Sequence, residues 1–251
     1  MLTFEQIRTM KKNNSEFAFC ILILIHSVYV LSSIFSTAIF CRITNAVLTT
    51  LTIVLLSTYI SVDFYIRFIL FNDKNLHHST IRLGFVLILL ILIVPWTNII
   101  VHEYRMNISI KEEIIYPRST TFSWFLYLDF LLIISLLILT IRNQSDFSFY
   151  QIVFLSIGIP LASLWLYMGL LMANNKIHHW IISISFYILS IIQIIHLIYI
   201  TSKTILEYKT LSKLNDLTLF SLLIIIFICS GANLLIHLLT IVMSFVLMDN
   251  I

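Results

Sequence analysis

Long runs of apolar residues, separated by short polar stretches, dominate the pattern along this chain. Seven runs are long enough to cross about 30 Å of hydrocarbon, which takes roughly 20 residues of α-helix. They cover residues 17–40, 45–71, 81–103, 121–141, 149–173, 177–201 and 217–247. The runs are far too long for strands, and the alternation typical of a membrane β-barrel is absent from the sequence. Since lipid offers the backbone no hydrogen-bond partners, the pattern predicts an all-α polytopic membrane protein with seven transmembrane helices.

Composition agrees with this pattern. The chain is 60% hydrophobic and 11% charged, with a mean hydropathy of +1.02, whereas a soluble domain is about half apolar and a quarter charged. The connections are short, the longest at 104–120, so we expect a single domain over residues 1–251 with a polar N-terminal tail at 1–16. Few glycines and prolines, with abundant isoleucine, phenylalanine, tyrosine and asparagine, are typical of a strongly AT-biased and often organellar genome.

Lysines and arginines are divided unevenly between the two ends of the predicted helices. The end that carries the N-terminus has ten: Arg8, Lys11, Lys12, Arg67, Lys74, Arg82, Arg142, Lys203, Lys209 and Lys213. The opposite end has five: Arg42, Arg105, Lys111, Arg118 and Lys176. The positive-inside bias therefore predicts that the N-terminus lies on the inner side of the membrane. A net charge of only +3, without a basic tract, argues against a nucleic-acid partner.

The connection after the second predicted helix, FNDKNLHHSTIRLG at 71–84, gathers cations and imidazoles at the inner side. Cations and hydrogen-bond donors at this depth suit the phosphates of anionic lipids. An ordinary positive-inside connection would also contain arginine, but it does not explain two adjacent histidines, which are neutral for much of the time at pH 7. We interpret Arg67, His77, His78 and Arg82 as a candidate lipid-binding group.

Two carboxylates lie inside predicted helices. Asp63 precedes Arg67 by four residues, so the two share a helix face, and the spacing predicts an ion pair that lets the carboxylate stay charged near the interface. A proton or lipid site is the alternative at this position. Asp129 lies about two turns into the fourth predicted helix, and the sequence names no partner for it.

Three histidines, His26, His196 and His237, also lie inside predicted helices. Two on facing helices could ligate haem and three could hold a metal ion. A lone intramembrane histidine more often hydrogen-bonds to a neighbouring helix, so we interpret His196 and His237 as structural polar groups and expect no metal. Asn233 stands one turn before His237, beside a small pair at 231–232, where another backbone is expected to approach closely.

Motifs for catalysis are absent from the sequence, which has no glycine-rich phosphate loop, no Ser-His-Asp spacing and no HExxH. We therefore expect no catalytic centre in this chain.

The stretch HHST, followed by IRLG, resembles a pattern in subunit III of cytochrome c oxidase. In that family an arginine near the end of the second helix precedes a His-His-Thr stretch and an Arg-x-Gly that opens the third helix. The matching positions here are Arg67, His77, His78, Ser79 or Thr80, Arg82 and Gly84. QIIHLIYI, with Gln193 and His196, is weakly similar to a second family segment. The family's glutamate in helix 3 has no counterpart in FVLILLILIVPW, so its proton-handling role is not carried over.

This resemblance implies a subunit without a redox centre that packs on the catalytic oxidase subunit in the mitochondrial inner membrane, with its N-terminus in the matrix. It also implies two sub-bundles, helices 1–2 and helices 3–7, with phospholipid of the cardiolipin or phosphatidylglycerol type in the cleft between them. No other cofactor would bind directly. A membrane subunit of a respiratory NADH dehydrogenase is the main alternative. A seven-span receptor and a small transporter are weaker ones, since the last predicted helix lacks a retinal lysine and no pair of broken helices is evident.

Overall fold

The computed structural model describes residues 15–40, 43–70, 77–107, 117–139, 149–173, 180–211 and 217–248. These ranges are helical and contain no strand. They form α2 (Ser15–Phe40), α3 (Ile43–Tyr65), the π-helix η1 (Ile66–Leu70), α4 (His77–Asn107), α6 (Pro117–Leu139), α7 (Phe149–Ala173), α8 (Trp180–Leu211) and α9 (Leu217–Met248). Each of the seven α-helices contains an apolar stretch long enough to cross a membrane, which confirms the polytopic all-α class.

Helix bounds follow the predicted apolar runs to within a few residues, with two informative differences. α8 continues past the predicted end at 201 as far as Leu211, because the polar segment TSKTILEYKTL contains no glycine or proline that would end a helix. The second predicted helix ends in η1, a wider π-helical turn. Such turns occur often at functional sites, and this one contains Arg67.

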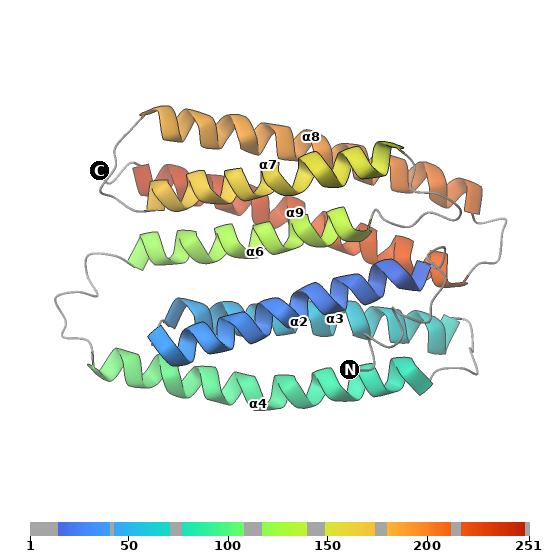
Figure 1. Cartoon of the computed structure of the whole chain (residues 1–251), viewed down its shortest axis with the longest axis horizontal. Helices are drawn as coiled ribbons and strands as arrows, with labels where there is room; N and C mark the ends of the chain where they lie inside the picture. Colours follow the sequence, from blue (N-terminus) through green and yellow to red (C-terminus); the bar gives the residue numbers. More distant parts are fainter. Residues whose placement is uncertain are drawn as a thin grey trace.

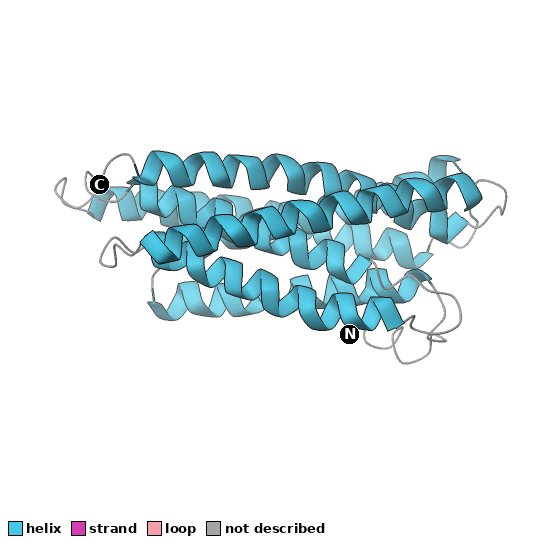
Figure 2. Ribbon diagram, turned by 90° about the horizontal axis from the view of Figure 1, so that it is seen from above, coloured by secondary structure: helices cyan, strands magenta, loops and turns pink. Residues whose placement is uncertain are grey.

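Successive helices run in opposite directions along the long axis of an elongated bundle (Figure 1; Figure 2). Short connections favour this up-and-down arrangement. α4 lies at one edge of the bundle, α2 and α3 lie beside it, and α6 follows; α7, α9 and α8 form the opposite side (Figure 1).

α6 is the most enclosed helix. It packs closely against α7 and α9 and also contacts α2 and α3, and every residue in 131–139 is buried. The main hydrophobic core is built around it from all seven α-helices. A polar side chain on α6 therefore meets protein rather than lipid, and must find its hydrogen-bond partners there.

The structure corrects the predicted division into helices 1–2 and 3–7. α4 makes its main contact with α3, where Thr50 and Thr97 hydrogen-bond at 2.6 Å. Val30, Ile53 and Ile93 form a small core shared by α2, α3 and α4. The groups are therefore α2–α4 and α6–α9. α2 and α3 also pack directly on α6 and α9. The phospholipid cleft that the resemblance implied stays a prediction.

Candidate functional site

A carboxylate and an imidazole meet in the interior of the bundle. Asp129 of α6 and His237 of α9 are both buried, and Oδ2 of Asp129 lies 2.6 Å from Nδ1 of His237. Both residues lie near the middle of their membrane spans. Ionisable side chains at this depth are energetically costly and mark functional sites by default. The contact supplies the partner of Asp129 that the sequence did not name.

Asn233 completes the hydrogen bonding of this carboxyl group. In the amide orientation that suits both neighbours, its NH₂ group donates to Oδ1 of Asp129 at 3.0 Å, and its oxygen accepts from the backbone N–H of Ile133 at 3.3 Å. The two carboxyl oxygens thus have separate donors, one on Asn233 and one on His237. Full satisfaction of this kind is what makes a buried polar network tolerable in a low-dielectric interior.

The second ring nitrogen of His237 determines how many protons the pair holds. Nε2 lies 3.3 Å from the backbone carbonyl of Ser190 on α8. A carbonyl only accepts, so Nε2 must carry a hydrogen to make this bond. The proton between Nδ1 and Asp129 is then shared: the pair is a carboxylate with an imidazolium, or a carboxylic acid with a neutral imidazole. Both forms have zero net charge, which limits the penalty for burial in hydrocarbon.

Trp165 of α7 packs against His237 and hydrogen-bonds to Ser190 of α8. Its Nε1–H donates to the Ser190 hydroxyl at 2.8 Å, and that hydroxyl donates to the backbone oxygen of Phe186 at 2.9 Å. The indole ring stacks on Phe186 at 5.4 Å and lies 5.3 Å from the ring of His237. The Ser190 hydroxyl is therefore engaged away from His237, so Asp129, His237 and Ser190 are not arranged as a nucleophilic triad.

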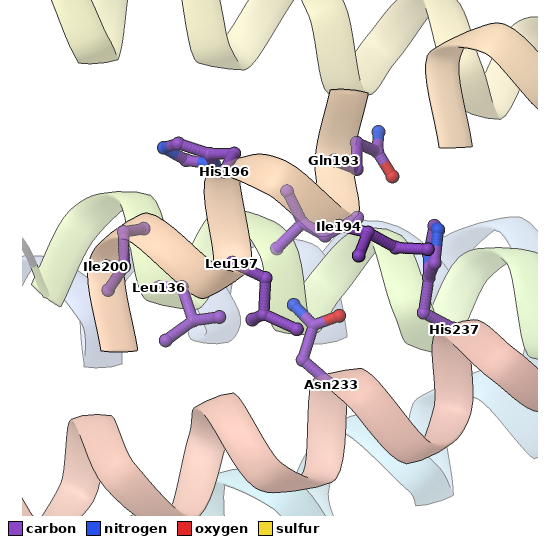
Figure 3. A pocket seen from close by; sticks show the side chains of 9 residues that line it. Leu136, Gln193, Ile194, His196, Leu197, Ile200, Asn233 and His237 are labelled. Carbon is purple, nitrogen blue, oxygen red and sulfur yellow. The ribbon is translucent and has the colours of Figure 1, made fainter. Parts of the chain in front are cut away.

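A cavity adjoins the cluster between α6, α8 and α9. It is lined by Ile133, Leu136, Gln193, Ile194, His196, Leu197, Ile200, Asn233 and His237 (Figure 3). The space left for a solute is about that of one water molecule. Asn233 and His237 rise into it from α9 toward the residues of α8 (Figure 3). A small cavity with converging polar groups is a natural binding-site candidate.

A second polar cluster lies where α3 ends and α4 begins. Oδ1 of Asp63 is 3.0 Å from Nε of Arg67, and both side chains are largely buried. The Ser79 hydroxyl lies 3.5 Å from Oδ2 of Asp63, a weak contact that ties α4 to the ion pair. His77 and His78 are the first residues of α4, but their side chains lie outside the described part of the chain. Their predicted lipid contacts therefore remain predictions.

Arg82 belongs to the same end of the bundle, one turn after Ser79. Its Nη2 donates to Sγ of Cys20 at 3.4 Å, and its guanidinium carbon lies 6.0 Å from the ring centroid of Phe19. Both partners are on α2, so the cation is held over an apolar and weakly polar surface. The structure thus places two of the four predicted lipid-binding residues, Arg67 and Arg82, at one end of the α2–α4 group.

The intramembrane histidines enter separate contacts. His26 bonds to the backbone oxygen of Leu22 at 2.8 Å and to the hydroxyl of Ser135 on α6 at 3.2 Å. His196 lines the cavity, while His237 pairs with Asp129. Among the described residues no group of three His, Cys, Asp or Glu side chains is placed to hold a metal ion.

The prediction that another backbone approaches α9 closely at 231–232 is wrong at Gly231. That residue is exposed, and a Cβ atom built on it would meet nothing within 4 Å. The close approach is instead at Gly169 of α7, where a Cβ would lie 2.5 Å from Cδ2 of Leu126 and 3.1 Å from Cε2 of Phe186. Within residues 230–237, Asn233 and His237 are buried while Gly231 is exposed, so the polar face is the one that turns inward.

No protein-family model matches the chain, and neither a curated protein sequence nor a solved structure matches it.

Proposed function

We propose that the chain is a membrane subunit, without a redox centre of its own, of a respiratory complex, and that it binds an anionic phospholipid at the end of the α2–α4 group. The observation that carries the proposal is the presence of two arginines where α3 ends and α4 begins. Arg67 pairs with Asp63, and Arg82 lies against Cys20 of α2. Of the four candidate lipid-binding residues, Arg67 lies in η1, and His77, His78 and Arg82 lie in the first turns of α4.

Charge and depth both suit a lipid phosphate. Arg67 pairs with Asp63, while Arg82 lies against Cys20 and Phe19 of α2 and adds a second cation. The three side chains Arg67, Arg82 and Asp63 together carry a formal net charge of +1. Arg67 lies in the last turn of the second candidate span and Arg82 in the first turn of the third. Long cationic side chains near the end of a span can reach the headgroup phosphates. A guanidinium offers five N–H donors in a planar fork that matches phosphate oxygens. A polar headgroup would then lie against η1 and the first turns of α4.

The outer surface supports a role as a subunit within the membrane. Large apolar side chains are exposed along α4, among them Phe85, Ile88, Ile91, Leu92 and Ile99. α4 contacts mainly α3, so its remaining faces require cover from lipid chains or from another membrane protein. Because α8 has a similar exposed face, the chain offers two broad apolar surfaces on opposite sides of the bundle (Figure 1).

The oxidase is the most specific candidate for the complex, through the resemblance of the Arg67–Gly84 segment to subunit III. On this proposal the chain lies in the mitochondrial inner membrane with its N-terminus in the matrix, beside the catalytic subunit. The packing of α4 on α3 differs from the two-group arrangement expected for that family. A subunit of the NADH dehydrogenase type is the alternative.

Purification of the complex in mild detergent tests the proposal. Haem a absorbance in the purified complex is expected for the oxidase, whereas flavin and iron–sulfur signals would transfer the chain to the dehydrogenase. Neither signal, or a chain that purifies alone, would contradict a respiratory subunit.

Lipid analysis of the same preparation tests the lipid site. Arg67→Gln and Arg82→Gln are each expected to lower the amount of co-purified anionic phospholipid. Lys203→Gln is the matched control, since it removes a cation from the same predicted side but from α8 in the other helix group. An equal loss in all three variants would show a diffuse charge effect instead of a site.

A further inference from the structure

One face of α9 carries a polar residue on each turn. Ser230, Asn233, His237, Thr240 and Ser244 are all buried. At 1.5 Å per residue these positions extend over about 21 Å, a large part of the roughly 30 Å hydrocarbon thickness. The face turns toward α6 and α8, where further polar partners lie. Ser, Thr and Asn side chains inside a membrane helix hydrogen-bond to neighbouring helices, whereas a buried ionisable residue such as His237 marks a candidate proton or ion pathway.

The two sides of the Asp129–His237 pair differ. Toward the end of the bundle where α9 finishes, aromatic rings pack against one another. Phe122 meets Phe186 edge-on at 6.1 Å, Phe186 meets Tyr187 at 5.6 Å, and Tyr187 stacks on Phe245 at 5.1 Å. With Trp165 stacked on Phe186, aromatic rings pack closely on this side of the pair, beside the buried hydroxyls of Thr240 and Ser244.

Toward the other end, where α9 begins, lies the cavity. On α6 it is lined by residues that follow Asp129, and on α8 by residues that follow Ser190. Since the helices alternate in direction (Figure 1), all of these positions lie on one side of the pair. Beyond the cavity the Thr201 and Ser230 hydroxyls hydrogen-bond to each other, which continues the polar row toward that end.

The side chain of Gln193 independently indicates that the cavity holds a polar ligand. This side chain is more than nine-tenths buried and lines the cavity, and neither its Nε2 nor its Oε1 has a hydrogen-bond partner among the described residues. Leaving a buried donor or acceptor unsatisfied costs about 1–3 kcal/mol each. A ligand that both donates and accepts hydrogen bonds would satisfy the amide, and the space allows one about as large as water.

We propose that this cavity binds water and gives the Asp129–His237 pair proton access from one side of the membrane only, the end where α9 begins. A water molecule in the cavity can take up the proton of a His237 ring nitrogen while another proton is returned to the pair, so the pair keeps zero net charge. The aromatic packing blocks the opposite side. By the positive-inside prediction, the open side is the inner one.

Hydrogen–deuterium exchange at His237 tests this directly. The full-length protein, with ¹⁵N-labelled histidine, is reconstituted in phospholipid bilayers, and its ring N–H signals are followed by solid-state NMR after transfer to D₂O. The His237 signals are assigned by their loss in His237→Gln. Gln193→Leu fills the cavity with an apolar side chain of similar size and is expected to slow exchange at His237 at least tenfold. Gln193→Met serves the same purpose if the leucine variant does not fold.

Thr240→Val is the matched control. It removes a hydroxyl one turn beyond His237 on the aromatic side, where the Thr240 hydroxyl donates only to Ile236 of its own helix in the hydrogen bonds described. Exchange at His237 is expected to be unchanged in this variant. An unaltered rate in both Gln193 variants, or no exchange in the wild-type protein, would overturn the water site. Equal slowing in Thr240→Val would overturn the one-sided access.

Discussion

Nδ1 of His237 and Oδ2 of Asp129 lie 2.6 Å apart, although 108 positions separate the two residues in the chain. The contact joins α6, the most enclosed helix, to α9, with which it makes one of the two most extensive helix–helix contacts in the described structure. This hydrogen-bonded pair, with Asn233 beside it, favours the rotation of α9 that turns the polar face toward α6.

Breaking the pair is expected to destabilise the fold more than removing it altogether. His237→Leu leaves the Asp129 carboxyl group buried without its imidazole and should lower the free energy of unfolding by about 3 kcal/mol. Asp129→Leu should do the same to His237. The double variant should lose clearly less than the sum of the two, and a double-mutant cycle in detergent measures the difference.

Ser163→Ala is the control for this cycle, since its hydroxyl is exposed and donates to Ile159 of its own helix. Its effect should stay within about 0.5 kcal/mol. Additive losses in the Asp129 and His237 variants would show that the two side chains do not interact.

Gly169 and Gly231 are expected to respond to alanine in opposite ways. At Gly169 the added methyl group would press on Leu126 and Phe186, which are fully buried and have little room to move, so Gly169→Ala should lower the free energy of unfolding by about 1–3 kcal/mol. Gly231→Ala meets open space in a helix and should be neutral or stabilising by up to about 1 kcal/mol. Thermal unfolding of both variants in the same detergent gives the comparison; equal effects would contradict the packing of α7 on α6.

The indole of Trp165 is expected to be coupled to Ser190. Ser190→Ala leaves the buried Nε1–H of Trp165 without its acceptor and should destabilise by about 1–3 kcal/mol. Adding Trp165→Phe removes that unpaired donor while keeping an aromatic ring. The double variant should therefore lose less unfolding free energy than the sum of the two single variants. Unfolding free energies of the two single variants and the double variant measure the coupling. A coupling energy near zero would mean that this hydrogen bond does not form.

If the proposed lipid site exists, the net charge at the end of the α2–α4 group should determine how much anionic lipid co-purifies. Asp63→Asn removes the carboxylate that neutralises Arg67 and raises the local charge by one unit, so co-purified anionic lipid should be retained or increased. Arg67→Gln changes the charge in the opposite direction and should reduce it. Mass spectrometry of the extracted lipids measures both; a loss of lipid in Asp63→Asn would show that the ion pair shapes the site and that net charge does not.

The number, type and approximate ends of the helices could be predicted from the sequence because a membrane span is a local signal. About 20 apolar residues suffice to identify it, whatever the rest of the chain does. The pairing of Asp63 with Arg67 was also accessible, since residues four apart on a helix share a face. These features depend on spacing within one segment.

Contacts between helices were not accessible in the same way. Asp129 and His237 were each visible as polar residues in apolar runs, but nothing in the spacing within either helix indicates that they meet. The inward face of α9 had a signal that was overlooked: Ser230, Asn233, His237, Thr240 and Ser244 recur at three- or four-residue intervals. The small residues beside Asn233 suggested a helix contact instead, and Gly231 turned out to lie on the outer face.

A solid-state NMR distance measurement in lipid bilayers tests the central contact most directly. With ¹³C in the carboxyl groups of aspartate and ¹⁵N in histidine, dipolar recoupling should detect a close carbon–nitrogen pair formed by Asp129 and His237. That pair should disappear in both Asp129→Asn and His237→Gln, as a 2.6 Å contact between Oδ2 and Nδ1 requires. Absence of any such coupling in the wild-type protein, or its survival in either variant, would show that α6 and α9 do not meet through these side chains.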